Sequence, residues 1–219
     1  MVVSVDSRLG SVGLMAEGDG QSYIYRVAQF MEGVGVPEFG IQRVLARSKY
    51  FDAQRASFTM QADHRGVREC STQFSSAIEI DVAHALLADS GVGVDGVGLM
   101  EAMAELLNQG TIHSIATRAA TSGHLTESVC FELNEPETDW DSIRSAGVLC
   151  GLSDSDWAPL DAFRSSSSKC PAYASVQYRD GNVIPGLKLS FEDVYGELVG
   201  PILLDDGQRE WVDSMRASL

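Results

Sequence analysis

Segments in which apolar and polar residues alternate occur in pairs along this chain, and a turn signal joins the two members of each pair. The turn signals are Arg8-Leu9-Gly10, Asp63-His64-Arg65-Gly66, Thr121-Ser122-Gly123 and Asp180-Gly181-Asn182. Alternation of this kind is typical of strands with one covered face, and short turns of these residues join such strands into hairpins. The turns recur at a spacing of about 57 residues, which indicates a structural repeat.

The alternation predicts four hairpins. Their strands are expected at 2–6 and 11–16, 56–62 and 67–74, 112–118 and 125–133, and 174–179 and 183–191. Between the hairpins, apolar residues recur at spacings of three and four, which predicts helices. The expected helices lie around Tyr23 to Phe30, after Pro37, and at 82–87, 99–107, 141–149, 156–163 and 208–215. The glycine-rich stretch 91–98 is expected to be a flexible connection.

These elements predict a single α+β domain over residues 1–219, built from about four hairpin-plus-helix-pair repeats. Consecutive hairpins of this kind join one antiparallel sheet with helices on one face. A sheet of about eight strands can curl and close into a barrel with the helices outside, and whether it closes here is left open.

The alternation also assigns the strand residues to two faces. The face expected under the helices carries, in the third hairpin, Leu125, Glu127, Val129, Phe131 and Leu133, and in the last hairpin, Val176, Tyr178, Val183, Pro185, Leu187, Leu189 and Phe191. The opposite face is polar. It carries Ser57, Thr59, Gln61, Glu69, Ser71, Gln73, Thr126, Ser128, Cys130, Glu132, Ser175, Gln177, Arg179, Lys188 and Ser190.

Two interpretations of the polar face compete. It is either the solvated side of an open sheet, or it lines a lumen that binds a ligand. In the second interpretation Arg179 and Lys188 hold an anionic group, and Ser175, Gln177 and Gln61 orient the rest of the molecule.

Charge narrows the choice of partners. Asp and Glu outnumber Lys and Arg by 31 to 16, so the formal net charge is -15. Such a surface repels phosphate backbones and anionic membranes, so nucleic acid and membrane are not expected as partners. No apolar run reaches the roughly 18 to 20 residues of a membrane span, and a cytoplasmic protein is expected.

The sequence gives little indication of a metal site or of a catalytic nucleophile. Cys70, Cys130, Cys150 and Cys170 lack the close pairing of a zinc site and are expected to be free thiols. Glu79, Asp81 and His84 could bind a divalent cation, but surface acids at a strand-to-helix junction explain them as well. No partner can be placed beside His64, His113 or His124, so a catalytic triad is not indicated.

The last part of the chain resembles a known family. Lys169-Cys170-Pro171-Ala172-Tyr173, a hairpin ending in Pro185-Gly186-Leu187-Lys188-Leu189-Ser190, and a closing helix resemble the final repeat of the αββα-barrel aromatic prenyltransferases. That family joins helices and antiparallel hairpins into a barrel with a polar, solvent-filled lumen. Its members commonly have more repeats than the four counted here, so closure of the barrel is in question.

The resemblance implies transfer of a prenyl group from its diphosphate to an aromatic carbon in secondary metabolism. A basic residue of the last hairpin binds the diphosphate in the family, and Arg179 falls nearest, with Lys188 on the same face. Glu69 or Glu132 would then remove the ring proton. No cofactor is indicated with certainty, and a magnesium requirement is left open. The alternative is a noncatalytic module that binds a small molecule or pairs its sheet with that of another subunit in a homo-oligomer.

Overall fold

The structure is a computed structural model that describes residues 2–6, 11–18, 20–51, 56–63, 65–133, 140–158, 161 and 171–190, with the backbone alone before residue 22 and at residue 63. Its strands are β1 (Val2–Asp6), β2 (Ser11–Gly18), β3 (Ala56–Asp63), β4 (Gly66–Glu79), β5 (Thr111–Ala120), β6 (Leu125–Glu132), β7 (Tyr173–Arg179) and β8 (Asn182–Ser190). Its helices are α1 (Gly20–Gly33), α2 (Glu38–Arg47), α3 (Ile80–Asp89), α4 (Val94–Leu106) and α5 (Trp140–Leu149).

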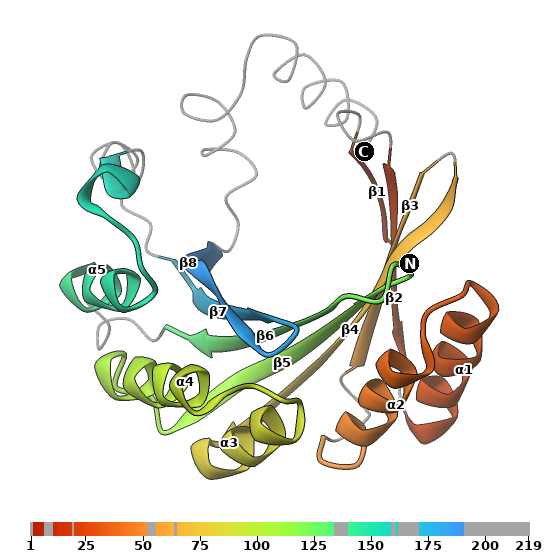
Figure 1. Ribbon diagram of the computed structural model, residues 1–219, viewed down its shortest axis with the longest axis horizontal. Helices are drawn as coiled ribbons and strands as arrows, with labels where there is room; N and C mark the ends of the chain where they lie inside the picture. The colour runs from red at the N-terminus through yellow and green to blue at the C-terminus, as the bar shows by residue number, and fades with distance from the viewer. Residues whose placement is uncertain are drawn as a thin grey trace, which may run out of the picture.

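The eight strands form one antiparallel sheet, and each strand pairs with its neighbours in sequence. The sheet is strongly curved, and the helices α1 to α5 all lie along its convex side (Figure 1). The antiparallel α+β architecture expected from the sequence is therefore confirmed. Within the described residues, β1 and β8 are the two ends of the sheet and do not pair with each other, so the sheet is open between them.

The predicted hairpins coincide with the observed ones to within a few residues, except that β4 continues to Glu79. The turn between β7 and β8 shows why the residues of a turn are enough to predict a hairpin. Arg179 pairs with Asn182, and the two residues between them, Asp180 and Gly181, have φ angles of 50° and 81°. Both central residues of a type I′ hairpin turn need positive φ, which Asp and Gly tolerate best.

The prediction of a flexible connection at 91–98 is wrong from Val94 on, because α4 begins there. The glycine at Gly96 serves close packing instead. A Cβ atom at Gly96 would lie 2.6 Å from Cγ1 of Val92 and 3.2 Å from Cε1 of Tyr178. The Tyr178 hydroxyl donates a hydrogen bond to the Gly96 carbonyl oxygen over 3.0 Å, so α4 is tied to β7 at this point.

Other helix predictions fare differently. The helix expected at 156–163 is seen as a helical stretch at 154–158, and the one expected at 208–215 lies outside the described residues. The junction at Glu79 and Ile80 is the strand-to-helix transition that the sequence indicated. Cys70, Cys130 and Cys150 are free thiols as expected, and Cys170 lies outside the described residues.

The hydrophobic core lies between the convex face of the sheet and the helices. Strand residues such as Phe74, Ile115 and Val129 and helix residues such as Leu87 and Met100 are fully buried there. The residues that the alternation assigned to this face at 125–133 and on β7 are buried there. On β8, Pro185 is instead exposed, and Phe191 lies outside the described residues. The covered and open faces of β6 and β7 were thus predicted correctly.

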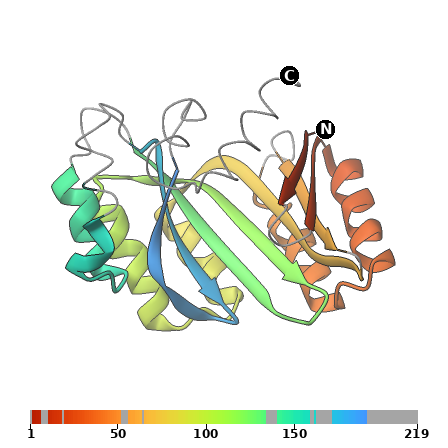
Figure 2. The same cartoon turned by 90° about the horizontal axis from the view of Figure 1, so that it is seen from above.

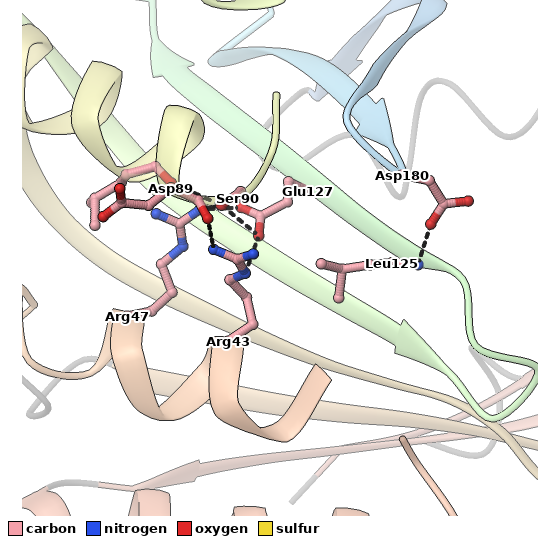
Figure 3. A network of polar contacts seen from close by, with 8 residues as sticks. Arg43, Arg47, Asp89, Ser90, Leu125, Glu127 and Asp180 are labelled. Carbon is pink, nitrogen blue, oxygen red and sulfur yellow. Dashed lines mark hydrogen bonds and ion pairs between the residues drawn. The ribbon is translucent and has the colours of Figure 1, made fainter. Parts of the chain in front are cut away.

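One strongly polar cluster is buried among these apolar side chains (Figure 3). Glu127 of β6 is 3% exposed and Arg47 of α2 is 1% exposed, and the two form a hydrogen-bonded ion pair. Burial lowers the pKa of Arg47, and the carboxylate of Glu127 opposes that effect. Ser90, just after α3, donates to Glu127 over 3.2 Å, and Arg43 of α2 lies 3.8 Å from the same carboxylate. The cluster therefore links α2, the end of α3 and β6.

Candidate functional site

A pocket of about 370 Å³ lies on the concave face of the sheet. Figure 2, which looks onto this face, shows strands β4 to β8 running across it with the helices behind. The pocket is lined mainly by hydroxyl, amide and other polar side chains from β3 to β8. They are Thr59, Ser71, Gln73, His113, Ser114, Ala116, Arg118, Ser128, Cys130, Tyr173, Ser175, Gln177, Lys188 and Ser190.

Strand register explains why residues so far apart in sequence meet. Ser114 pairs with Cys130, Cys130 with Ser175, and Ser175 with Lys188. Because directly paired residues project to the same side of a sheet, these four side chains form one row across β5 to β8. A neighbouring row runs from Gln73 on β4 to Gln177 on β7.

Lys188 is the cation of the first row. Its side chain is exposed, and no ion pair joins it to any residue in the described ranges. A bulge precedes it: Ser175 pairs with Lys188 and Gln177 with Ile184, so three residues of β8 stand opposite one of β7. The backbone N–H of Gly186 in this bulge donates to the Cys150 carbonyl oxygen over 2.8 Å. The bulge therefore connects β8 to the residue after α5 and sets the register in which Lys188 pairs with Ser175.

Cys130 lies in the middle of the same row. Burial raises the pKa of its thiol, while hydrogen bonds with Ser175 and Ser114 and the charge of Lys188 act in the opposite direction. The burial effect is the largest, so the thiol stays protonated at neutral pH. Cys130 is thus a lining group rather than a thiolate nucleophile.

Arg179 and Gln61 share the polar face but lie outside the pocket lining. Arg179 stands four residues along β7 from Ser175, the partner of Lys188, which corresponds to about 13 Å. Arg179 and Lys188 therefore belong to opposite ends of the face, and their backbones are not placed to hold one phosphate group together. The expectation of a joint cation clamp is not supported by this spacing.

The two glutamates proposed as bases both lie beside cationic or titratable partners. Glu69 forms an ion pair with Arg118, its Oε1 3.2 Å from Nε. Burial raises the pKa of the Glu69 carboxyl, and the charges of Arg118 and Arg179 oppose the rise. Arg118 lines the pocket and Glu69 does not. The carboxylate of Glu69 is therefore committed to an arginine at the pocket edge.

Glu132 lies 3.3 Å from His113, measured from Oε2 to Nδ1. The His113 ring also packs on the ring of Tyr173, with centroids 4.8 Å apart and an interplanar angle of 46°. His113 and Tyr173 line the pocket. The expectation that His113 lacks a partner is therefore wrong. His124 likewise has one, since its Nδ1 lies 2.9 Å from Oδ2 of Asp180, and His64 lies outside the described residues.

Sequence reasoning missed His113 because the alternation breaks in β5. Ile112 and Ile115 are both buried on the convex side, while His113 and Ser114 between them both line the pocket. The break lies opposite a bulge of β4, where the register shifts between Ser75 and Ile78 so that two residues of β4 stand opposite His113. Bulges accompany local changes in side-chain direction, and nothing in the sequence of β5 marks this one.

Across the described ranges, no group of three or more His, Cys, Asp or Glu is arranged to hold a metal ion. His84, considered as a ligand with Glu79 and Asp81, instead pairs with Glu101, its Nδ1 2.6 Å from Oε1. None of the helices in the described part of the chain is long and apolar enough to cross a membrane. No family model matches the chain, and no curated protein sequence matches it.

Proposed function

We propose that this protein is a small-molecule transferase that moves a prenyl group from a prenyl diphosphate to an aromatic acceptor held on the concave face. One observation carries the proposal. Lys188, which forms no ion pair with any residue that the structure describes, lies in a row with Ser114, Cys130 and Ser175 within a polar pocket on the concave side of the sheet. The repeated order of two strands and two helices is also what the resemblance to αββα-barrel prenyltransferases implies.

The charge developed in this reaction is that of the departing diphosphate. An ammonium group and hydroxyl donors fixed around the oxygens that gain charge would stabilise it. Lys188 supplies the ammonium, and Ser175 and Ser190 supply hydroxyls beside it on the same pocket wall. The chain as a whole has a formal net charge of -15, so a lysine in this pocket contrasts with the acidic character of the rest of the protein.

The reaction also needs protection of an allylic cation from water. The sheet is curved (Figure 1), and residues of β3 to β8 line the pocket on its concave side. Closure of the sheet into a barrel would complete the enclosure, and it forms part of this proposal. Magnesium, which would accompany the diphosphate as part of the substrate, is included in the test for that reason.

The test is thermal unfolding with and without a panel of prenyl diphosphates, each with and without magnesium. A ligand at 100 times its Kd stabilises the folded state by about 2.7 kcal/mol, or roughly 5 to 10 °C for a chain of this size. We expect this shift in the wild type and its loss in Lys188→Ala. Lys49→Ala, which removes an exposed lysine after α2, is the control and should retain it. Arg179→Ala tests whether the diphosphate extends to the far end of the face.

Absence of a shift with every diphosphate would reject the transferase. The second candidate, an assembly module, rests on the unpaired terminal strands β1 and β8 of the described sheet. Exposed strand edges pair readily with other strands. Molar mass in solution separates the two, because an assembly module should form a defined oligomer whether or not a diphosphate is present.

A further inference from the structure

We propose that the exposed face of α2 binds the same face of a second copy of this chain, which gives a two-fold dimer with antiparallel α2 helices. The helix lies on the convex side of the sheet, whereas the candidate pocket lies on the concave side (Figure 1). This inference goes beyond the proposed function and does not depend on it. The surface is also separate from the strand edges on which the assembly module rests.

Exposed aromatic side chains are concentrated in the first helix pair and the turn after it. Within the part of the chain that the structure describes, every exposed Phe or Tyr belongs to residues 20–51: Tyr25, Phe30, Phe39 and Tyr50. Phe39 lies on α2 itself and is 52% exposed. Aromatic side chains are enriched in the buried centre of protein interfaces, where a few of them supply most of the affinity. The first helix pair is therefore the part of the described surface that best suits a protein partner.

An open groove of about 530 Å³ lies along α2. It is lined by Glu38, Phe39, Gln42, Arg43 and Ala46, all from this helix. Arg43 also reaches α3, since its Nη1 donates to the Asp89 carbonyl oxygen over 2.7 Å. That bond fixes this side of α2 against the neighbouring helix pair, so the groove is formed before a partner arrives. A groove lined by one helix accepts the side chains of a second helix laid along it.

The spacing of Phe39 and Ala46 makes this face self-complementary. Both residues are exposed, and they lie seven positions apart, which is about two turns or about 10.5 Å along the helix. When two α2 helices lie antiparallel about a two-fold axis near Gln42, Phe39 of each copy stands opposite Ala46 of the other. A large side chain then lies over a small one at both places, as in the packing of ridges into grooves. Two-fold contacts of one surface with itself are the commonest arrangement in protein oligomers.

The charges at the two ends of the face fit the same antiparallel arrangement. Glu38 lies in the first turn of α2, and Lys49 lies two residues past its last residue, Arg47. The backbone N–H of Lys49 donates to the Ala46 carbonyl oxygen over 3.3 Å, so the chain still turns helically there. Glu38 and Lys49 are both exposed. Antiparallel packing places Glu38 of one copy beside Lys49 of the other at both ends, whereas parallel packing would bring like charges together.

The size of the surface implies a weak dimer. One face of a helix of 10 residues buries less than the area of a stable interface, so we expect a Kd of about 10 to 100 µM. The formal net charge of -15 opposes association when salt is low. The measurement therefore belongs at about 0.15 M salt, where charges more than about 8 Å apart are screened.

Sedimentation equilibrium of the full chain over about 5 to 500 µM covers this range of affinity. We expect the molar mass of the wild type to rise from that of a monomer toward that of a dimer. Phe39→Ser should raise the Kd at least about tenfold, as loss of a central aromatic side chain implies. Leu149→Ser is the matched control, because Leu149 at the end of α5 is 48% exposed and lies outside the groove. It should keep the Kd of the wild type.

Charge exchange tests the antiparallel orientation. Glu38→Lys makes the chain less acidic and Lys49→Glu makes it more acidic, yet both should weaken the dimer, because each puts like charges side by side. The double variant Glu38→Lys/Lys49→Glu restores opposite charges at both ends and should recover the Kd of the wild type. Strengthening by Glu38→Lys alone, or a double variant as weak as the single ones, would reject this orientation. Neither residue lines the concave pocket, so diphosphate binding is not expected to change in these variants.

A monomer at every concentration would overturn the inference. An oligomer with the same Kd in the wild type and in Phe39→Ser would also overturn it, and would assign the association to the strand edges instead. A dimer that is lost in Phe39→Ser and kept in Leu149→Ser is the expected result, and it places the contact on α2.

Discussion

At the scale of single residues, the buried carboxylate of Glu127 constrains the packing of the helices on the sheet more than any exposed charge does. Glu127 interrupts an otherwise apolar series on β6, and in the described part of the chain its carboxylate contacts Arg47 of α2 and Ser90 just after α3. An unpaired charge in this environment would be prohibitively costly. The pair therefore specifies how these helices seat on the sheet, although an ion pair contributes little net stability over apolar packing.

Glu127→Gln should lower the free energy of unfolding by about 3 to 5 kcal/mol, because it leaves Arg47 buried without its counter-charge. Urea unfolding monitored by circular dichroism measures the change. Glu69→Gln is the matched control: its partner Arg118 is half-exposed, and the loss should stay within about 1 kcal/mol. Equal effects of the two substitutions would contradict the structural role given to the Arg47 cluster.

Asp180 provides a pH-dependent contribution at the β7–β8 turn. The Leu125 backbone N–H donates to Oδ1 over 2.9 Å and His124 contacts Oδ2, and these bonds hold the pKa of the carboxyl below its usual value. A depressed pKa in the folded state contributes stability above the unfolded pKa of about 3.9 that is lost as the pH falls through the folded value.

Asp180→Asn retains an acceptor oxygen and tolerates positive φ, but it removes the charge. The difference in unfolding free energy between wild type and Asp180→Asn should be constant above about pH 5 and shrink below about pH 4. Urea unfolding from pH 3 to pH 6 tests this. A difference that grows toward low pH would show that the carboxyl is not stabilised in its charged form.

Some residues of the candidate site can be predicted from the alternation of apolar and polar residues along one strand, and others cannot. Ser175, Gln177 and Lys188 were assigned to the polar face by alternation and do line the pocket. His113 was not assigned to the pocket, because the alternation breaks in β5 where that strand stands opposite the bulge of β4. Pairing between strands far apart in sequence is not encoded in either strand alone.

At the scale of elements, glycines distinguish helices that are packed closely from helices that are not. In α5 a Cβ atom at Gly147 would lie 2.1 Å from Cζ2 of the buried Trp157. In α4 a Cβ atom at Gly98 would meet nothing within 4 Å. The two positions look alike in sequence, since each is a helical glycine.

We expect Gly98→Ala to stabilise the protein by about 0.5 to 1 kcal/mol, because alanine is the better helix former. Gly147→Ala should instead destabilise it by about 1 to 3 kcal/mol through the clash with Trp157. Thermal unfolding of both variants shows whether each substitution raises or lowers the stability of the protein. The same sign for both would mean that α5 does not pack on Trp157 as described.

At the scale of the whole molecule, the topology follows from connectivity. Each strand pairs with its neighbours in sequence, so the sheet contains no crossover between strands far apart in the chain. Hairpins joined in this order by helices form one meandering sheet. The described helices all lie on the convex face (Figure 1), and the pocket on the concave face is lined mainly by polar side chains. This division gives the molecule a core on one side and a candidate binding surface on the other.

The sequence by itself determined the elements, because turn chemistry and apolar periodicity act over a few residues. It thereby predicted the hairpins, most helices and the polar identity of the concave face. Only the tertiary structure decided which polar residues meet. It separated Lys188 from Arg179, joined His113 to Glu132, and paired Glu127 with Arg47. The physical reason is that register, bulges and helix seating depend on contacts between segments far apart in the chain, where one residue of shift moves a side chain to the opposite face.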